Sequence, residues 1–223
     1  MSGFRTLALG STLALLVSCG GAEQQVVTTF LTAVQGNDEA TLSGVSLVKF
    51  PGSVASWEIL EVGPESKEPF LLAEIRKEFV GLEKEIEINN ERHSNFLSDN
   101  AKKAEEYQRR LQRDPEYKFT GEMADFQAEL EARIAAQKEL EEKLEKVRQR
   151  IIGLRDAAGL SMNTAVNDNF QGDVKGRVVR LKVNDGSEEK IYSIVIRRYE
   201  LSDPERNLTP MPRWIITDIE EQA

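Results

Sequence analysis

The stretch that decides the fold is Glu122 to Ala158, EMADFQAELEARIAAQKELEEKLEKVRQRIIGLRDAA. Large side chains, nearly all apolar, recur in it every three or four residues: Met123, Phe126, Leu130, Ile134, Gln137, Leu140, Leu144, Val147, Ile151 and Leu154. Charged residues fill the positions between them. This spacing with charged flanks is typical of a helix in a coiled coil. The stretch therefore predicts one long helix from about Glu122 to Ala158.

The residues before it repeat the pattern and predict a second long helix over 67–113. Ser66 is expected to cap this helix, and Pro69 is tolerated in a first turn. Its seam would be Ile75, Phe79, Leu82, Ile86, Asn89, His93, Phe96, Asn100, Ala104, Tyr107 and Leu111. Asp114-Pro115 breaks the run and Gly121 closes the connection. Residues 67–158 thus predict an antiparallel two-helix coiled-coil hairpin.

Pairing the two seams about the break predicts their register. The expected pairs are Leu111 with Met123, Tyr107 with Phe126, His93 with Leu140, Ile86 with Val147, and Leu82 with Ile151. About 37 paired residues at 1.5 Å each make a rod of roughly 55 Å. The polar seam residues Asn89, His93 and Asn100 cost stability but can fix the register.

The segment before the hairpin predicts two helices and a strand. Residues 23–36 form an amphipathic pattern that ends at Gly36. Asn37 or Asp38 can cap a second short helix that ends near Leu42. Residues 57–62 alternate with period two and predict a strand.

The segment after the hairpin predicts an antiparallel meander. A loose stretch over 160–173 precedes a strand over 174–183, and Asn184-Asp185-Gly186 is a strong turn sequence. A partner strand over 189–200, a Pro-rich crossing over 201–212 and a last strand over 213–220 follow. The expected fold class is therefore α+β, with helices packed on a curved antiparallel sheet.

The N-terminus has the pattern of an export signal. Arg5 precedes an apolar run from Leu7 to Val17, which is shorter than the roughly 20 residues that a membrane span needs. The run ends in Leu16-Val17-Ser18-Cys19, which resembles the lipobox of bacterial lipoproteins. The resemblance implies that 1–18 is a signal peptide, that Cys19 carries lipid, and that 19–25 is the tether. Gly20, in place of an aspartate, implies the outer membrane and its periplasmic side in a Gram-negative cell.

The flanking segments together resemble the cystatin-like cone of the nuclear-transport-factor-like superfamily. The residues that carry the resemblance are the pattern over 26–42, Lys190 to Ile194, and Trp214 to Ile219. It implies one cone domain made of 26–66 and 159–223, interrupted by the hairpin at 67–158. No catalytic residue is carried over by this resemblance.

Candidate sites for chemistry are few. His93 is expected to pack in the seam, and no cofactor or metal set is expected, although Asn167-Asp168-Asn169 and Asp173 could offer oxygens to calcium. Tyr192, Tyr199 and Asp218 are the residues that a cone pocket could use. Trp57 and Trp214 are expected in the core, where aromatic rings bury large areas.

Composition narrows the functional classes. The chain carries a net charge of -9 and no basic patch with interleaved aromatics, so nucleic acid is not an expected partner. The lack of a catalytic constellation favours a protein that is not an enzyme. The sequence predicts a lipid-anchored association or scaffold module whose coiled-coil arm contacts itself or another envelope protein. Its alternatives are a spacer arm, a small-ligand module using the cone pocket, and an enzyme on that pocket.

Overall fold

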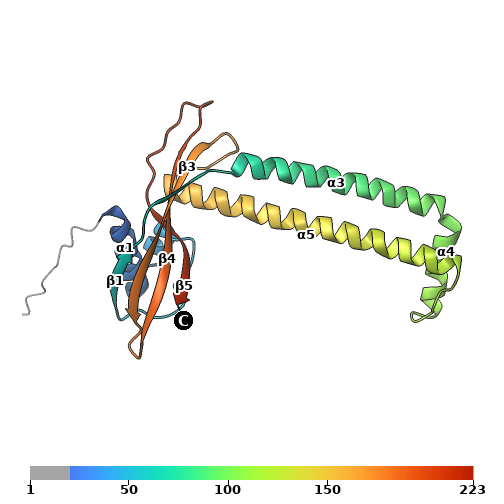
Figure 1. Cartoon of the computed structure of the whole chain (residues 1–223), viewed down its shortest axis with the longest axis horizontal. Coiled ribbons are helices and arrows are strands. Elements are labelled where there is room, and N and C mark those ends of the chain that lie inside the picture. The colour runs from blue at the N-terminus through green and yellow to red at the C-terminus, as the bar shows by residue number, and fades with distance from the viewer. Residues whose placement is uncertain (1–20, 223) are drawn as a thin grey trace, which may run out of the picture.

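The computed structural model describes residues 21–222, so the predicted signal peptide 1–18 and the predicted lipidation site Cys19 lie outside the described residues. Within that range the chain is an α+β protein with a long helical arm (Figure 1). The helices are α1 (Ala22–Gly36), α2 (Glu39–Val45), α3 (Leu72–Asp99), α4 (Ala101–Arg113) and α5 (Glu122–Met162). The strands are β1 (Ser56–Val62), β2 (Ser66–Pro69), β3 (Gln171–Asn184), β4 (Glu189–Ser202) and β5 (Ile215–Gln222). The predicted α+β class is confirmed.

The sheet is antiparallel and is built on the long β3–β4 hairpin. These two strands pair without interruption from Gln171 and Ser202 to Asn184 and Glu189. β5 lies beside β4, while β1 and β2 pair with successive parts of the other edge of β3. The turn contains Gly186 at φ 102°, a conformation that glycine adopts without steric cost. The predicted pairing of these two strands and the turn between them are therefore confirmed.

Helix α1 covers one face of the sheet. Its buried side chains Val27, Phe30 and Leu31 pack against alternate residues of β3 and β4, including Leu181 and Ile194. Asp38, one of the two predicted caps, caps α2 by accepting a hydrogen bond from the Thr41 backbone N–H. The left-handed residue after α1 is Asn37 at φ 52°, rather than Gly36.

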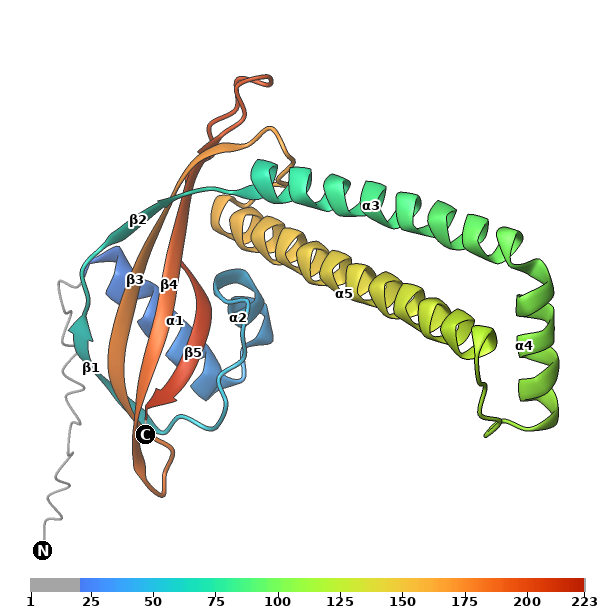
Figure 2. The same cartoon turned by 45° about the vertical axis from the view of Figure 1, so that its right-hand side comes forward.

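The base of the arm packs on the opposite face of the sheet. Side chains alternate along a strand, so Tyr199 and Leu201 point away from the face that Ile194 occupies. They pack with Ala158 and Met162 of α5 in a second apolar cluster. Figure 2 shows the arm extending away from the sheet domain from this base. The two clusters, one on each face, anchor α1 and the arm to the same sheet.

The prediction that Ser66 caps a helix with Pro69 in its first turn is wrong. Residues 66–69 form β2 and pair with β3, and the Phe70 backbone N–H continues the pattern by donating to the Gly172 carbonyl. Pairing with β3 satisfies backbone groups that the sequence pattern assigned to a helix. The helix starts only at Leu72, whose side chain is fully buried.

The prediction of one unbroken helix to residue 113 is also wrong. Asn100 has φ -113° and ψ 26°, and separates α3 from α4. Its side-chain amide donates to the Phe96 carbonyl at 2.9 Å, and such side-chain bonds compete with the helix backbone. Figures 1 and 2 show α4 turning away from the axis of α3.

Helix α5 extends beyond its predicted end at Ala158. It continues through Gly159 to Met162, and the residue that ends it is Asn163 at φ 50°. A glycine inside a helix costs about 1 kcal/mol, and the burial of Met162 against the sheet outweighs that cost. The predicted loose stretch over 160–173 is therefore shorter, because α5 and β3 occupy its two ends.

Candidate functional site

The candidate functional site is the arm, made of α3, α4 and α5. Helices α3 and α5 lie side by side and leave the sheet domain together (Figures 1 and 2). Helix α5 has 41 residues, which at 1.5 Å each is about 60 Å. The arm differs along its length in how completely it buries its own apolar side chains, so its base, middle and tip are described in turn.

The base of the arm is a closed apolar core. Phe79 of α3 and Val147 and Ile151 of α5 are each no more than 6% exposed. Ser161 ties this core to the sheet, because its hydroxyl donates to the Arg213 carbonyl at 2.6 Å and accepts from the Tyr199 backbone N–H at 3.1 Å. The arm therefore leaves the sheet domain from a fixed support.

The middle of the arm buries its own seam only in part. In α3 no described residue beyond Phe79 is buried, and in α5 none is buried between Phe126 and Val147. Ile86, Leu130 and Leu140 of this part are only partly buried, whereas Leu82 and Leu144 pack against the base core. Beside the seam, on the side that Asn90 and His93 also line, Ile134 is 53% exposed. Two helices alone thus leave apolar surface open along the middle of the arm.

A polar pair fixes the register in this middle part. The Asn89 side-chain amide donates to the Gln137 side-chain oxygen at 2.8 Å, and Gln137 donates in turn to Glu141 at 2.7 Å. The sequence pattern, which paired His93 with Leu140 and Ile86 with Val147, predicts Leu144 opposite Asn89. That register is wrong by seven residues, which is one heptad. The break at Asn100 is the reason, since the predicted pairing assumed a continuous first helix.

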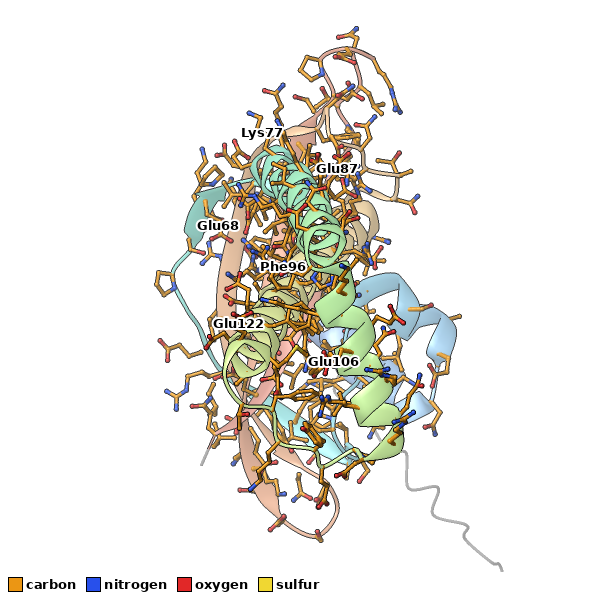
Figure 3. The ribbon with its side chains drawn as sticks, turned by 90° about the vertical axis from the view of Figure 1, so that its right-hand side faces the viewer. Glu68, Lys77, Glu87, Phe96, Glu106 and Glu122 are labelled. Atoms are coloured by element: carbon orange, nitrogen blue, oxygen red, sulfur yellow. The ribbon has the colours of Figure 1, made fainter. Side chains whose placement is uncertain are left out.

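The tip of the arm is aromatic. Phe96 stacks on Phe126 with ring centres 5.3 Å apart, and Tyr107 of α4 contacts the edge of Phe126 at 5.9 Å. The predicted Tyr107–Phe126 contact is therefore confirmed, although α4 reaches it from its own direction. Arg133 lies 4.6 Å above the Phe96 ring, in the seam position that the sequence assigned to Ile134. In Figure 3, which faces the end of the arm, Phe96 lies between α3 and α5.

Phe119 closes the end of the arm. It is 9% exposed and stacks on Tyr107, and Tyr117 contacts its edge. Residues 101–120 hold six Lys/Arg against four Asp/Glu, a net +2 in a chain of net -9. The tip is therefore packed by aromatic rings and is more basic than the chain as a whole.

The structure does not bring together the residues that the sequence suggested for catalysis or ligand binding. His93 is half-buried in the seam, beside a small pocket of about 200 Å³ that Ile134 and Gln137 also line. Tyr192 and Tyr199 point to opposite faces of the sheet, in different apolar clusters, and Asp218 is exposed. These three side chains form no common pocket. Burial raises the pKa of both tyrosine hydroxyls, which suits core positions.

The aspartates that the sequence suggested for calcium binding form ion pairs instead. Asp168 bonds the Arg155 guanidinium at 2.5 Å and lies 3.7 Å from Arg76, while Asp173 pairs with Lys67 at 2.9 Å. Within residues 21–222, no three His, Cys, Asp or Glu side chains are grouped as a metal site. Of the two tryptophans, Trp214 is 5% exposed as predicted, and Trp57 packs against the same cluster while partly exposed.

A pocket that the sequence did not indicate lies outside the sheet. It has a volume of about 530 Å³ and is bounded by the end of α1, by α2 and by the loop over 46–54. The loop is fixed at both ends, since Leu47 N–H donates to the Ile216 carbonyl and the Ser53 hydroxyl donates to the Asp185 carbonyl. Leu42, Phe50 and Lys49 are among the residues that line it. No sequence motif marks it, because the loop is positioned only by the folded sheet.

Comparison with protein-family models, with curated proteins and with solved structures finds no significant match to this chain. Among the described helices, none combines the length and the apolar character that crossing a membrane requires.

Proposed function

We propose that this chain is a lipid-anchored envelope protein in which a cystatin-like domain carries a coiled-coil arm, and that the arm is a non-catalytic association module. The single observation that carries the proposal is the open apolar seam in the middle of the arm. A third helix, from a second copy or from another envelope protein, would bury Ile134 and the partly exposed seam beside it.

The arm also has features that favour specific contact over mere length. Its base is fixed to the sheet by buried apolar groups, so a partner would meet a preoriented surface. The Asn89–Gln137 pair sets one register, which presents one arrangement of exposed side chains. A spacer needs neither an open apolar seam nor an aromatic tip.

The anchor is supported by the sequence of the N-terminal segment. The apolar run and the lipobox-like Leu16-Val17-Ser18-Cys19 stand directly before α1, which begins at Ala22. Two or three acyl chains on Cys19 would hold the protein stably at a membrane, because each buried methylene contributes about 0.8 kcal/mol. The location proposed is the cell envelope, and the outer membrane in a Gram-negative cell.

The test is in-cell crosslinking of the anchored protein beside a variant with a shortened arm. Residues 90–136 are replaced by a short Gly-Ser loop, which joins helices that already face each other at Asn89 and Gln137. This variant keeps the base core, whereas removing all of 67–158 would also remove β2 and Phe79. Val178→Thr, at an exposed apolar site on the sheet, is the control.

A specific crosslinked species is expected, which the control variant keeps and the short-arm variant loses. A self-crosslink identifies a second copy as the partner, and a heteromeric band identifies another protein. Identical products from all three proteins would overturn the proposal and leave the arm as a spacer.

A second candidate function is binding of a small apolar ligand in the pocket beside the 46–54 loop. Its volume of about 530 Å³ lies within the range of small-molecule sites, and Leu42, Leu47 and Phe50 are among the residues that line it. A ligand screen on Leu42→Arg, which fills the pocket with charge, tests it: hits that bind the variant equally well would exclude this pocket.

A further inference from the structure

A second concave surface lies at the opposite end of α1 from the pocket just described. It is a groove of about 370 Å³ between the first half of α1, the end of α2 and the segment that leads into β5. The polar groups that line it are Gln25, Thr29, Arg198 and Arg213, and no carboxylate lies among its lining residues. The groove is therefore lined by cations and neutral groups in a chain whose net charge is -9.

The two arginines are held in place by different contacts. Arg213 donates from Nε to the Leu160 carbonyl at 3.2 Å, and no carboxylate of the described residues pairs with it. Arg198 pairs with Glu200 at 2.6 Å, and its guanidinium lies 5.0 Å above the Trp214 ring. Arg213 is thus a cation with unused donors at the groove, and Arg198 is fixed beside it.

Two residues that line the groove also carry buried donors. Trp214 is 5% exposed, yet its indole Nε1–H has no hydrogen-bond partner among the described residues, and neither does the Nε of Arg198. Buried donors are nearly always paired in folded proteins, and an unpaired one is destabilising. A ligand that carries several acceptor oxygens would use the free donors of Arg213 and offer partners to these groups.

The position of the groove indicates where such a ligand comes from. Ala22 lines the groove, and Cys19 lies three residues earlier in the chain. Three residues span at most about 11 Å. The lipid on Cys19, on which this step rests as part of the proposed function, therefore brings the groove to the layer of lipid phosphates.

We propose that this groove binds the phosphate of an anionic lipid headgroup. The bound phosphate accepts hydrogen bonds from Arg213 and compensates the unpaired donors of Trp214 and Arg198. Together with the lipid on Cys19 it gives the domain a second attachment point, which orients the arm relative to the membrane.

The test uses the mature chain, residues 19–223, with Cys19→Ala, which carries neither the predicted signal peptide nor the lipid. Its binding is measured to vesicles of phosphatidylcholine and to vesicles of equimolar phosphatidylcholine and phosphatidylglycerol. A chain of net -9 is repelled by anionic vesicles unless a local site attracts them. Stronger binding to the anionic vesicles is expected, and equal or weaker binding overturns the proposal.

Two variants and a matched control locate the site. Arg213→Gln is expected to weaken binding to the anionic vesicles about five-fold, the factor that one Lys or Arg near an anionic surface contributes. Trp214→Phe keeps an aromatic ring but removes the indole donor, and it is also expected to weaken binding to the anionic vesicles. Arg180→Gln, on an exposed part of the sheet, should change nothing. Equal effects of Arg213→Gln and Arg180→Gln would overturn the assignment, and thermal melting confirms that each variant is folded.

Titration with inorganic phosphate distinguishes the two sources of the same chemistry. Saturable binding of phosphate that depends on Arg213, without any preference for anionic vesicles, would overturn the lipid as the ligand. Because the assay uses Cys19→Ala, its result is independent of the in-cell test of the anchor.

Discussion

The structure and the sequence pattern differ most clearly in the register of the two arm helices, and this difference can be tested directly. In the structure Asn89 faces Gln137, whereas the predicted pairing places Leu144 opposite Asn89. The two partners differ by seven residues, or about 10.5 Å along a helix. A disulfide forms only when the two Cα atoms are within about 7 Å, so a cysteine at position 89 can bond to just one of them.

The perturbation is a pair of double variants in a Cys19→Ala background, Asn89→Cys with Gln137→Cys and Asn89→Cys with Leu144→Cys. The first is expected to oxidise and the second to stay reduced, as measured by free-thiol titration and by mobility on non-reducing gels. Closing the 48-residue separation should stabilise the oxidised protein by up to about 4 kcal/mol in the chain-entropy description. A disulfide in the 89/144 pair and none in the 89/137 pair would refute the register.

Three further predictions follow from the anchor, the base and the β3–β4 turn. Cys19→Ala should move the protein from the membrane to the soluble fraction, and continued lipid labelling of that variant would exclude the lipobox. Phe79→Ala should lower the free energy of unfolding by about 3–5 kcal/mol because its ring is 6% exposed, whereas Ile134→Ala, at 53% exposed, should change it by about 0.5 kcal/mol or less in denaturant titration. Hydrogen bonds from Ser187 and Glu188 lower the pKa of Asp185 to about 2, so the turn gains stability that is complete above the usual carboxyl pKa of 3.8 and is lost as pH falls through about 2. NMR shifts of the Ser187 amide should follow that titration, and a midpoint near 3.8 would contradict the bonded turn.

Local patterns in the sequence are enough to predict much of this fold. The alternation over 57–62, the Asn184-Asp185-Gly186 turn and the cap at Asp38 depend on residues close in the chain, and all three are present in the structure. The seam of the arm is also predicted almost completely, because helical spacing is independent of what the helix meets. Arg133 in place of Ile134 is the exception, since its guanidinium packs on Phe96 from the other helix.

The features that could not be predicted depend on contacts between distant segments. β2 exists because residues 66–69 meet β3, more than 100 residues later in the chain. The heptad shift follows from a bend at Asn100 that changes which turns of α3 and α5 face each other. Each of the two concave surfaces beside α1 is completed by a loop whose position is set by the sheet. Tertiary packing overrides the local pattern at each of these places.

The measurement that tests the central claim most directly is site-specific photo-crosslinking in the cell. A photoreactive phenylalanine analogue is placed at Ile134 on the open middle of the arm, and separately at Val178, an exposed apolar site on the sheet. The association account predicts a discrete crosslinked product from position 134 and none from position 178. A product from position 178 with none from position 134 would contradict it and would show that the sheet, rather than the arm, meets the partner.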